Sequence, residues 1–256
     1  GSGSFAFTKS GNDTLTGNTT FNNLSISTVT TLNVLTPYVI TLLGTLTENG
    51  NGFLAGKIQR QETITTQGVP FSFGGIGATI VANNSGSLPG VTTIIASRKL
   101  SPTGFLSNQV VQRYYDVTVS SSSTSITLTL KYNQSQELNS QSKPVLKLWR
   151  STNSGTSWTL DNSSSVDTAA NTLSITSSIN NTTTQFAISP TTVKVFNVGN
   201  GDWNASSSWS PTGVPSISDS LFIGSGKIAN INASDSVLCK SVNIAGGLVF
   251  ASNGRL

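Results

Sequence analysis

The sequence contains no histidine and no methionine, and its single cysteine is Cys239. The lack of histidine removes the commonest general base and metal ligand, so an enzyme is not expected. One cysteine cannot form a disulfide framework within the chain, and we interpret Cys239 as a small buried thiol rather than a reactive group. No apolar run approaches the length that spans a bilayer, so we expect no membrane insertion.

Charged residues are also scarce. They make up 9% of the chain, against about 25% in ordinary globular proteins. The fourteen basic residues are scattered, without a run or a stripe, which argues against a nucleic-acid partner. Serine, threonine, asparagine and glycine fill the remaining positions. This composition is typical of an all-β extracellular or cell-surface protein.

The acidic residues are separated along the chain. The three glutamates are Glu48, Glu62 and Glu137. Each is expected in or beside a turn or an exposed strand, so no carboxylate pair for acid–base chemistry is evident. Asp202, Asp219 and Asp235 recur near the C-terminus, but a calcium site usually needs several carboxylates in one loop. We therefore expect no catalytic residues, no cofactor and no metal.

Short apolar bursts separated by small polar residues mark both ends of the chain. In the C-terminal region they fall at residues 221–223, 228–231, 242–244 and 248–250. A stack of short β-rungs needs such bursts, because each rung buries a few side chains and then turns a corner. The pattern predicts β-solenoid rungs over residues 1–57, and the start and rungs of a second solenoid over residues 191–256.

The middle of the chain has a different pattern. Longer alternating strands, divided by turns of serine, asparagine and glycine, predict an antiparallel Ig-like β-sandwich over residues 58–190. No stretch has the periodicity of an amphipathic helix. The expected fold class is therefore all-β, with β-solenoid segments at both ends flanking the sandwich.

Both solenoid segments are expected to need a further rung, because an uncovered rung leaves open edges. Residues 239–244 align with residues 21–26, which places Val242 and Ile244 on Leu24 and Ile26. If residue 256 leads into residue 1 of a following copy, the two segments lie 38 residues apart (256 − 242 + 24), or about two rungs. We therefore expect head-to-tail stacking of copies. The predicted seam consists of Phe5, Phe7, Leu248, Phe250 and Leu256.

The tryptophans allow two interpretations. Trp203 and Trp209 precede the first C-terminal rung, and we interpret them as structural lids over an open core. Residues 151–158 resemble the Asp-box hairpin, in which Trp158 packs beneath a glycine turn as a structural element. Exposed, coplanar rings of these residues or of Trp149 would instead indicate platforms for sugar rings.

Several stretches resemble modules of large Bacteroidetes-type secreted surface proteins. Residues 111–118, 146–151 and 155–158 resemble their β-sandwich module, and residues 201–219 resemble the first segment of their β-helical repeats. The resemblance implies an adhesin or extracellular fibre associated with type IX secretion. It supplies no catalytic residues. The sorting domain of such exported proteins is not present, which implies an interior repeat or removal of that domain.

The same proteins carry O-glycans on a short motif, in which aspartate precedes serine or threonine and a small or branched apolar residue follows. The candidate hydroxyls in this sequence are Thr14, Thr168, Ser220 and Ser236. A solvated glycan would block edge-to-edge aggregation on a surface with little charge. Alternatively, Asp-Ser and Asp-Thr pairs are simply turn residues.

We therefore expect a structural role. The chain is predicted to be a subunit or tandem repeat of an extracellular bacterial filament or giant adhesin, with further copies of itself as partners. The alternative is a carbohydrate-binding accessory module of a secreted protein. Buried tryptophan rings favour the filament, whereas two or more exposed rings in a groove favour carbohydrate binding.

Overall fold

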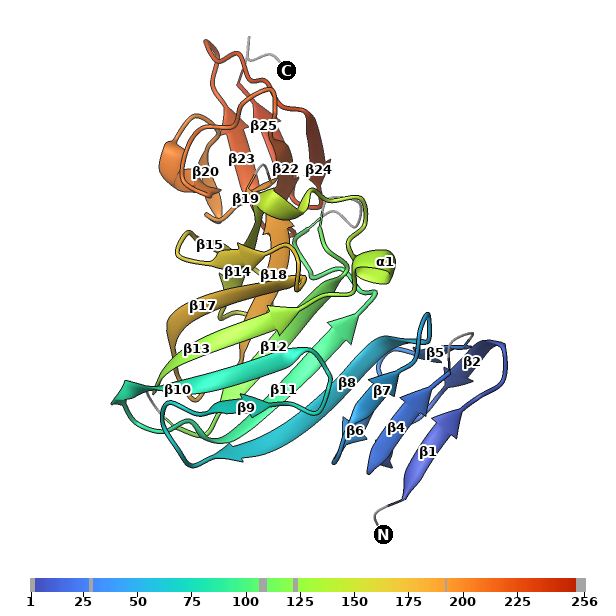
Figure 1. Cartoon of the computed structure of the whole chain (residues 1–256). Helices are drawn as coiled ribbons and strands as arrows, with labels where there is room; N and C mark the ends of the chain where they lie inside the picture. The colour runs from blue at the N-terminus through green and yellow to red at the C-terminus, as the bar shows by residue number, and fades with distance from the viewer. Residues whose placement is uncertain (1–2, 28–29, 106–109, 122–123, 192, 252–256) are drawn as a thin grey trace.

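The computed structural model describes residues 3–27, 30–105, 110–121, 124–191 and 193–251, and only the backbone of residue 85. The chain is all-β and has a β-solenoid arrangement, which confirms the coarse part of the fold prediction (Figure 1). Helical structure in the described residues is limited to α1 (Gln134–Glu137) and two single 3₁₀ turns, Lys143–Val145 and Ser206–Ser208. None of the helices in these residues is long and apolar enough to cross a membrane.

The N-terminal solenoid has three parallel sides. Its strands are β1 (Ser4–Phe7), β2 (Gly11–Leu15), β3 (Thr19–Phe21), β4 (Asn23–Ile26), β5 (Thr30–Val34), β6 (Val39–Leu42) and β7 (Leu46–Glu48). β1, β4 and β7 form one side, β2 and β5 a second, and β3 and β6 a third. Phe5 pairs with Leu24, so the chain returns to the same side after an interval close to the expected rung length. Alternate residues such as Leu24 and Ile26 point inward and are buried.

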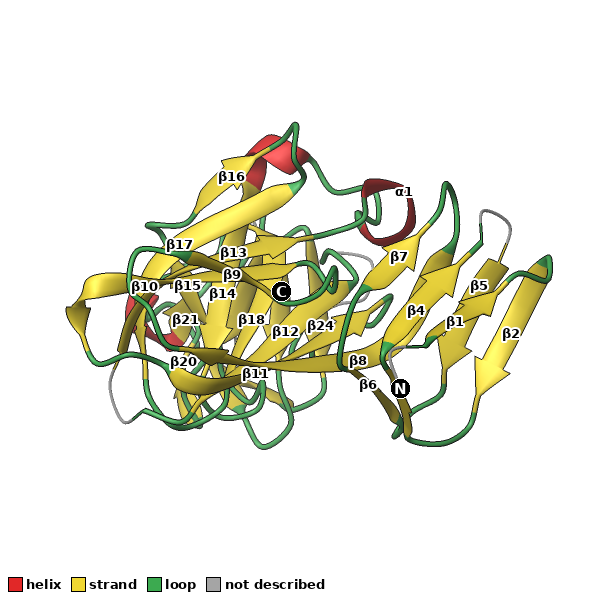
Figure 2. Ribbon diagram, turned by 60° about the horizontal axis from the view of Figure 1, so that its bottom comes forward, coloured by secondary structure: helices red, strands yellow, loops and turns green. Residues whose placement is uncertain are grey.

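Strand β8 (Phe53–Ile64) belongs to both the solenoid and the central region. It pairs in parallel with β5 and β6, and residues 56–64 pair antiparallel with β11 (Gly90–Arg98). Figure 2 shows β8 running from the N-terminal rungs into the central sheets. The predicted domain boundary between residues 57 and 58 therefore falls inside one strand, and a mixed ten-stranded sheet continues through it.

The central region adds two layers of strands. The remaining strands are β9 (Pro70–Ser72), β10 (Ala78–Gly86), β12 (Arg113–Val119), β13 (Thr124–Lys131), β14 (Leu146–Ser151), β15 (Thr159–Asp161), β16 (Ser165–Asp167), β17 (Thr172–Ile179) and β18 (Thr184–Pro190). One sheet has the order β16-β17-β13-β10-β9, and the ten-stranded sheet contains β15-β14-β18-β12-β11-β8. The finer prediction of an Ig-like sandwich is not confirmed, because the ten-stranded sheet is mixed rather than antiparallel throughout.

One apolar core extends through the N-terminal solenoid and the central sheets. Tyr115 and Val117 of β12 and Leu128 of β13 are buried in it, together with Ile40 and Ile58 of the solenoid. These side chains lie on alternate positions of their strands, because successive residues of a strand face opposite sides. The solenoid and the central sheets are therefore joined by packing as well as by backbone pairing.

The C-terminal solenoid has its own core. Its strands are β19 (Val193–Phe196), β20 (Asn200–Asp202), β21 (Trp209–Ser210), β22 (Ser220–Ile223), β23 (Ile228–Ile231), β24 (Ser241–Ile244) and β25 (Gly247–Phe250). β19, β22 and β24 form one parallel series, and β20, β23 and β25 form the other. Ile228 pairs with Gly247, so the rung from Ile228 has the same length as the rung that joins Phe5 to Leu24.

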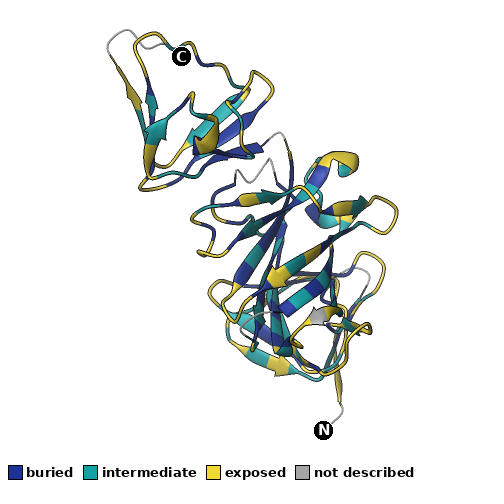
Figure 3. Ribbon diagram, turned by 90° about the vertical axis from the view of Figure 1, so that its left-hand side faces the viewer, coloured by how far each residue is buried: buried dark blue, intermediate teal, exposed yellow. Residues whose placement is uncertain are grey.

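Hydrogen bonds and apolar packing join the central region to the start of the C-terminal solenoid. The backbone N–H of Trp158 donates to Asn197 Oδ1 at 3.3 Å, and Asn197 Nδ2 donates to the Trp158 carbonyl at 2.8 Å. Val193 and Val195 of β19 pack with Trp149 and Trp158 in a separate buried cluster. The two solenoids lie at opposite ends of the molecule (Figures 1 and 3).

Replacement of Gly56 by alanine tests the close approach of β8 to the solenoid. Gly56 has φ +108°, and a Cβ atom there would lie 2.3 Å from the Val34 carbonyl oxygen. Gly11 is a matched control, because it has φ +110° and nothing within 4 Å of its Cβ position. Each change adds about 1–3 kcal/mol of backbone strain, and Gly56→Ala should cost about 1–3 kcal/mol more through overpacking. Denaturant unfolding measures the difference; equal losses would contradict the close approach.

Candidate functional site

The N-terminal solenoid has an open edge. Among the described residues, β1, β2 and β3 each have a strand partner on one side and none on the other. An edge strand presents unpaired backbone N–H and C=O groups that form a template for a further strand. This end of the molecule can therefore accept one more parallel rung.

Three phenylalanines cover the solenoid interior at this edge. The Phe5 ring centroid lies 5.0 Å from that of Phe7 and 5.4 Å from that of Phe21. Phe5 and Phe7 pair with Leu24 and Ile26, both buried, so the two rings belong to the inward-facing side of β1. Phe5 is nevertheless 51% exposed. A half-exposed ring that faces inward is a surface that another rung would bury.

The adjacent strand β2 has a carboxylate on its inward-facing side. Asp13 pairs with Leu32, which is fully buried, and Leu15 pairs with Val34, which is also buried. Asp13 itself is half-buried. A rung placed on β2 would bury this charge further, which is unfavourable without a partner.

In the described part of the chain, the C-terminal solenoid also has an open edge, because β24 pairs only with β22 and β25 only with β23. Val242 and Ile244 stand opposite buried residues of β22, and Leu248 and Phe250 stand opposite buried residues of β23. Ile244 and Phe250 are both 41% exposed, so the inward-facing side of this edge is also uncovered. Within one chain the predicted seam residues lie at opposite ends of the molecule, and Leu256 lies outside the described residues.

The predicted lid tryptophans lie inside the C-terminal core. Trp203 is fully buried and Trp209 is 2% exposed. Their rings meet edge-on at 5.1 Å, and Trp209 Nε1 donates to the Trp203 carbonyl at 2.7 Å. They pack with Phe196 and Leu221 of the first two rungs. An exposed indole would have contradicted a lid; the role of these residues as a lid stays a prediction.

The other two tryptophans are equally inaccessible. Trp149 and Trp158 are fully buried, and Trp158 Nε1 donates to the Thr103 carbonyl at 2.8 Å. In the hairpin of residues 151–158, Asn153 Oδ1 accepts from the Ser157 N–H at 2.9 Å, as a structural turn requires. No tryptophan ring is thus placed to stack on a sugar.

The predicted glycosylation sites differ in accessibility. Thr14, Thr168 and Ser236 are exposed, whereas Ser220 is buried and receives a hydrogen bond from Ser241 at 3.1 Å. The preceding aspartates often act in turns: Asp167 Oδ1, for example, accepts from the N–H groups of residues 169 and 170 at 2.9 Å each. Turn formation thus explains part of the motif without a glycan.

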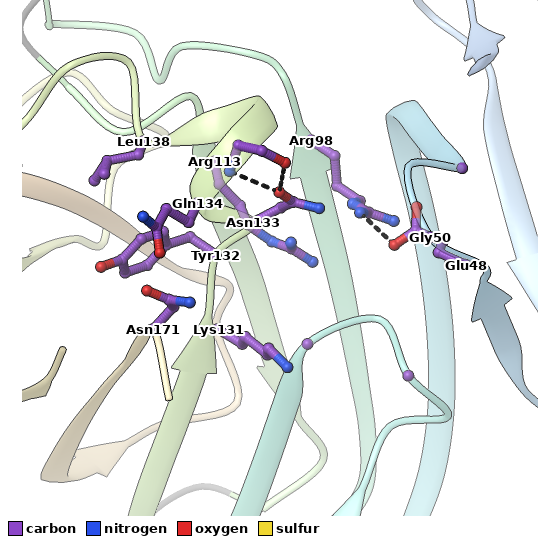
Figure 4. A pocket seen from close by; sticks show the side chains of 14 residues that line it. Glu48, Gly50, Arg98, Arg113, Lys131, Tyr132, Asn133, Gln134, Leu138 and Asn171 are labelled. Carbon is purple, nitrogen blue, oxygen red and sulfur yellow. Dashed lines mark hydrogen bonds and ion pairs between the residues drawn. The ribbon is translucent and has the colours of Figure 1, made fainter. Parts of the chain in front are cut away.

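Four charged side chains meet where the N-terminal solenoid joins the central sheets: Glu48, Arg98, Arg113 and Glu137. Figure 4 labels the first three. Arg98 Nη2, at the end of β11, donates to Glu48 Oε2 at 2.8 Å. Arg98 Nε lies 3.5 Å from Glu137 Oε1. Arg113 Nη1, at the start of β12, donates to Glu137 Oε2 at 2.9 Å. Arg98, Arg113 and Glu137 are almost completely buried.

Burial and neighbouring charges shift the pKa of two groups at this place, the Arg113 guanidinium and the Tyr115 hydroxyl. Burial is the largest single influence on the Arg113 guanidinium and would lower its pKa, but Glu137, Tyr115 and Glu48 together outweigh it and raise the pKa above its ordinary value. Burial raises the pKa of the Tyr115 hydroxyl to about 12, against the opposing effect of Arg113. Arg113 therefore stays charged and Tyr115 stays neutral at neutral pH.

A cavity of about 620 Å³ adjoins the cluster. It is lined by glycines of the turns before β8 and β10, by the end of β13 and by residues of α1. Glu48 is the one carboxylate that lines it in the described part of the chain, and it is paired with Arg98, so it is not placed as a free base. We interpret the cluster as a clamp that fixes the solenoid turn to strands β11 and β12.

The sequence analysis did not anticipate this cluster. Glu137 was expected in or beside a turn or an exposed strand; it lies in a short helix but is fully buried. The sequence did contain a sign of a buried ion pair, in the position of an arginine. Arg98 has the same strand parity as Ile94 and Ala96, which places its guanidinium on the buried side and requires an acidic partner.

No protein-family model, curated protein or solved structure matches the chain. Among the described residues, no three His, Cys, Asp or Glu side chains lie together as a metal site would require.

Replacement of Glu137 by glutamine tests the clamp. The change leaves Arg98 and Arg113 buried without full compensation, so unfolding should cost about 3–5 kcal/mol less. Glu62→Gln is the control, because Glu62 pairs with Arg60 at a partly exposed position, where pairs contribute about 0–1 kcal/mol. Chemical unfolding of both variants measures the contrast. Similar small losses would mean that Glu137 is not a clamp.

Proposed function

We propose that the chain is a structural subunit or tandem repeat of an extracellular bacterial filament or giant adhesin. Copies stack head to tail, and the C-terminal rungs of one copy continue into the N-terminal rungs of the next. The observation that carries the proposal is that each solenoid has an open parallel edge within the described residues, where inward-facing apolar side chains are incompletely covered.

The direction of the two solenoids supports this assembly. In the N-terminal solenoid the chain leaves the open edge at β1 and winds toward β7. In the C-terminal solenoid it starts at β19 and winds toward the open edge at β24. A copy that places its β1 beside β24 thus continues the same parallel winding, with no reversal of strand direction.

The connection between the two solenoids also suits a load-bearing filament. β8 is shared by the N-terminal solenoid and the central sheets, and Asn197 bonds twice to the backbone of Trp158 at the other junction. A module joined by backbone pairing and buried contacts transmits force better than domains on a flexible linker. The interpretation of residues 58–190 as an Ig-like sandwich remains part of this proposal.

The surface agrees with an extracellular location. With charged residues at only 9% of the chain, the exposed strands are covered mainly by hydroxyl and amide groups. The resemblance to Bacteroidetes-type secreted surface proteins implies the same location. A carbohydrate-binding module would instead need exposed aromatic rings, and all four tryptophans are buried.

Glycosylation should follow accessibility. We expect hexose-bearing peptides in native material at two or more of the exposed hydroxyls Thr14, Thr168 and Ser236, and none at the buried Ser220. Peptide mass mapping measures this, with the exposed Thr20, which follows no aspartate, as an unmodified control. Unmodified peptides at all four motif positions would contradict the glycan prediction.

Two copies fused in one chain test the stacking. The fused pair should unfold at a higher temperature than a single copy, because the seam buries apolar side chains. Phe5→Asp in the second copy should remove about 2–4 kcal/mol of that gain, since it deletes a ring and buries a carboxylate. Ala6→Asp is the matched control, because Ala6 is exposed on the outward-facing side of β1.

Each substitution is also measured in the single copy, so that its effect on the module is subtracted from its effect on the seam. The proposal is wrong if the fused pair unfolds like two independent copies. It is also wrong if Phe5→Asp and Ala6→Asp have the same effect after this subtraction.

A further inference from the structure

We infer a specific register for the contact between copies. β24 of one copy pairs in parallel with β1 of the next, with Val242 opposite Phe5 and Ile244 opposite Phe7. β25 then lies beside β2. The inference rests on the proposed stacking function and adds to it the partner strands and the residues that meet.

The direction in which the side chains of β24 and β1 point limits the possible registers. Val242 and Ile244 continue the inward-facing side set by the buried residues of β22. Phe5 and Phe7 occupy the inward-facing side of β1, above Leu24. A shift of one residue would place apolar side chains against outward-facing polar ones, because side chains alternate with a period of two. Odd shifts are therefore excluded.

The lengths of the two strands select among the even shifts. β24 and β1 each contain four residues, with the inward-facing ones second and fourth. In the inferred register all four positions pair, and Asn243 meets Ala6 on the outward-facing side. A shift of two residues would leave one inward-facing side chain of each strand without an apolar neighbour. Full pairing gives the largest buried apolar surface and the most backbone hydrogen bonds.

Rung length agrees with this register. In two directly fused copies, the chain would run from Val242 of the first copy through Leu256 to Phe5 of the second. This path has the same length as the rung from Phe5 to Leu24 and the rung from Ile228 to Gly247, since 256 − 242 + 5 equals both 24 − 5 and 247 − 228. The fused segment can therefore form a rung of the length that both solenoids already use.

Asp13 is the unfavourable position in this contact. With β25 beside β2, Leu248 and Phe250 face the side of β2 that carries Asp13. The contact would cover a half-buried carboxylate with apolar groups, which disfavours the charged form. Inward-pointing charges are a known device against indiscriminate pairing of edge strands. Asp13 therefore weakens the stack while restricting what can bind to β2.

Cysteine pairs in a fused pair of copies test the register. The native Cys239 is replaced by alanine in both copies, Asn243→Cys is placed in the first copy and Ala6→Cys in the second. Directly opposite residues lie about 5 Å apart at Cα, which a disulfide can bridge, whereas a residue two positions further along lies about 8 Å away. Thr8→Cys in place of Ala6→Cys is the matched control.

Under oxidised glutathione, the Ala6→Cys chain should form its disulfide at least tenfold faster than the Thr8→Cys chain. Equal rates, or a faster reaction at residue 8, would overturn the register. The unfolding temperature of the fused pair reports separately on stacking. If the fused pair is more stable than a single copy but the disulfide forms faster at residue 8, the register is wrong and the proposed stacking function is still supported. If the fused pair is no more stable than a single copy, both the register and the proposed stacking function are wrong.

Asp13→Asn in the second copy tests the contact of β25 with β2. It should raise the unfolding temperature of the fused pair more than that of the single copy. Asp167→Asn is the control, since it removes the same charge at an exposed turn and keeps an acceptor oxygen for its two backbone bonds. If the two substitutions act alike, β25 does not cover Asp13.

Discussion

Parallel backbone pairing between successive rungs is the interaction on which the rest of this structure depends. A rung of three to five residues per side buries too few side chains to be stable alone, so each rung relies on the next for hydrogen bonds and for cover. β8 completes this ladder for the N-terminal solenoid by entering the central sheets. The ladder has no such partner at β1 or at β24 among the described residues. Each of these two strands therefore still lacks the neighbouring rung on which the other rungs rely for hydrogen bonds and cover.

The clamp shows how a chain with little charge uses the charge that it has. Burying an ion pair gains little stability compared with apolar packing, but loss of one partner is costly. A buried ion pair therefore adds little to the free energy of unfolding, but it favours the one packing arrangement in which both charges are paired. Glu48 comes from the solenoid, Arg98 and Arg113 from the central strands, and Glu137 from α1. Their location suggests that the clamp sets the angle at which the solenoid leaves the central sheets.

Sequence reasoning succeeded where the determinants were local. The alternation in Leu24 and Ile26, and again in Val242 and Ile244, indicated rungs because the burial of a strand follows its neighbours in sequence. It failed where partners are distant. Nothing near residue 57 shows that β8 pairs with both β6 and β11. Nothing near Glu137 in the sequence identifies the two arginines with which it forms ion pairs. Those contacts depend on how separate elements are packed.

The strength of the seam bears on whether copies are separate or covalently linked. Phe5, Ile244 and Phe250 are each about half exposed, so covering each would contribute about 1 kcal/mol. With the half-buried Phe7, Val242 and Leu248, the total is about 3–6 kcal/mol. Association of free proteins costs about 4–15 kcal/mol in lost motion. Such a seam would hold separate chains weakly. Linking the copies makes the contact intramolecular, at an effective concentration of about millimolar. The same surface then suffices, which favours tandem repeats over free subunits.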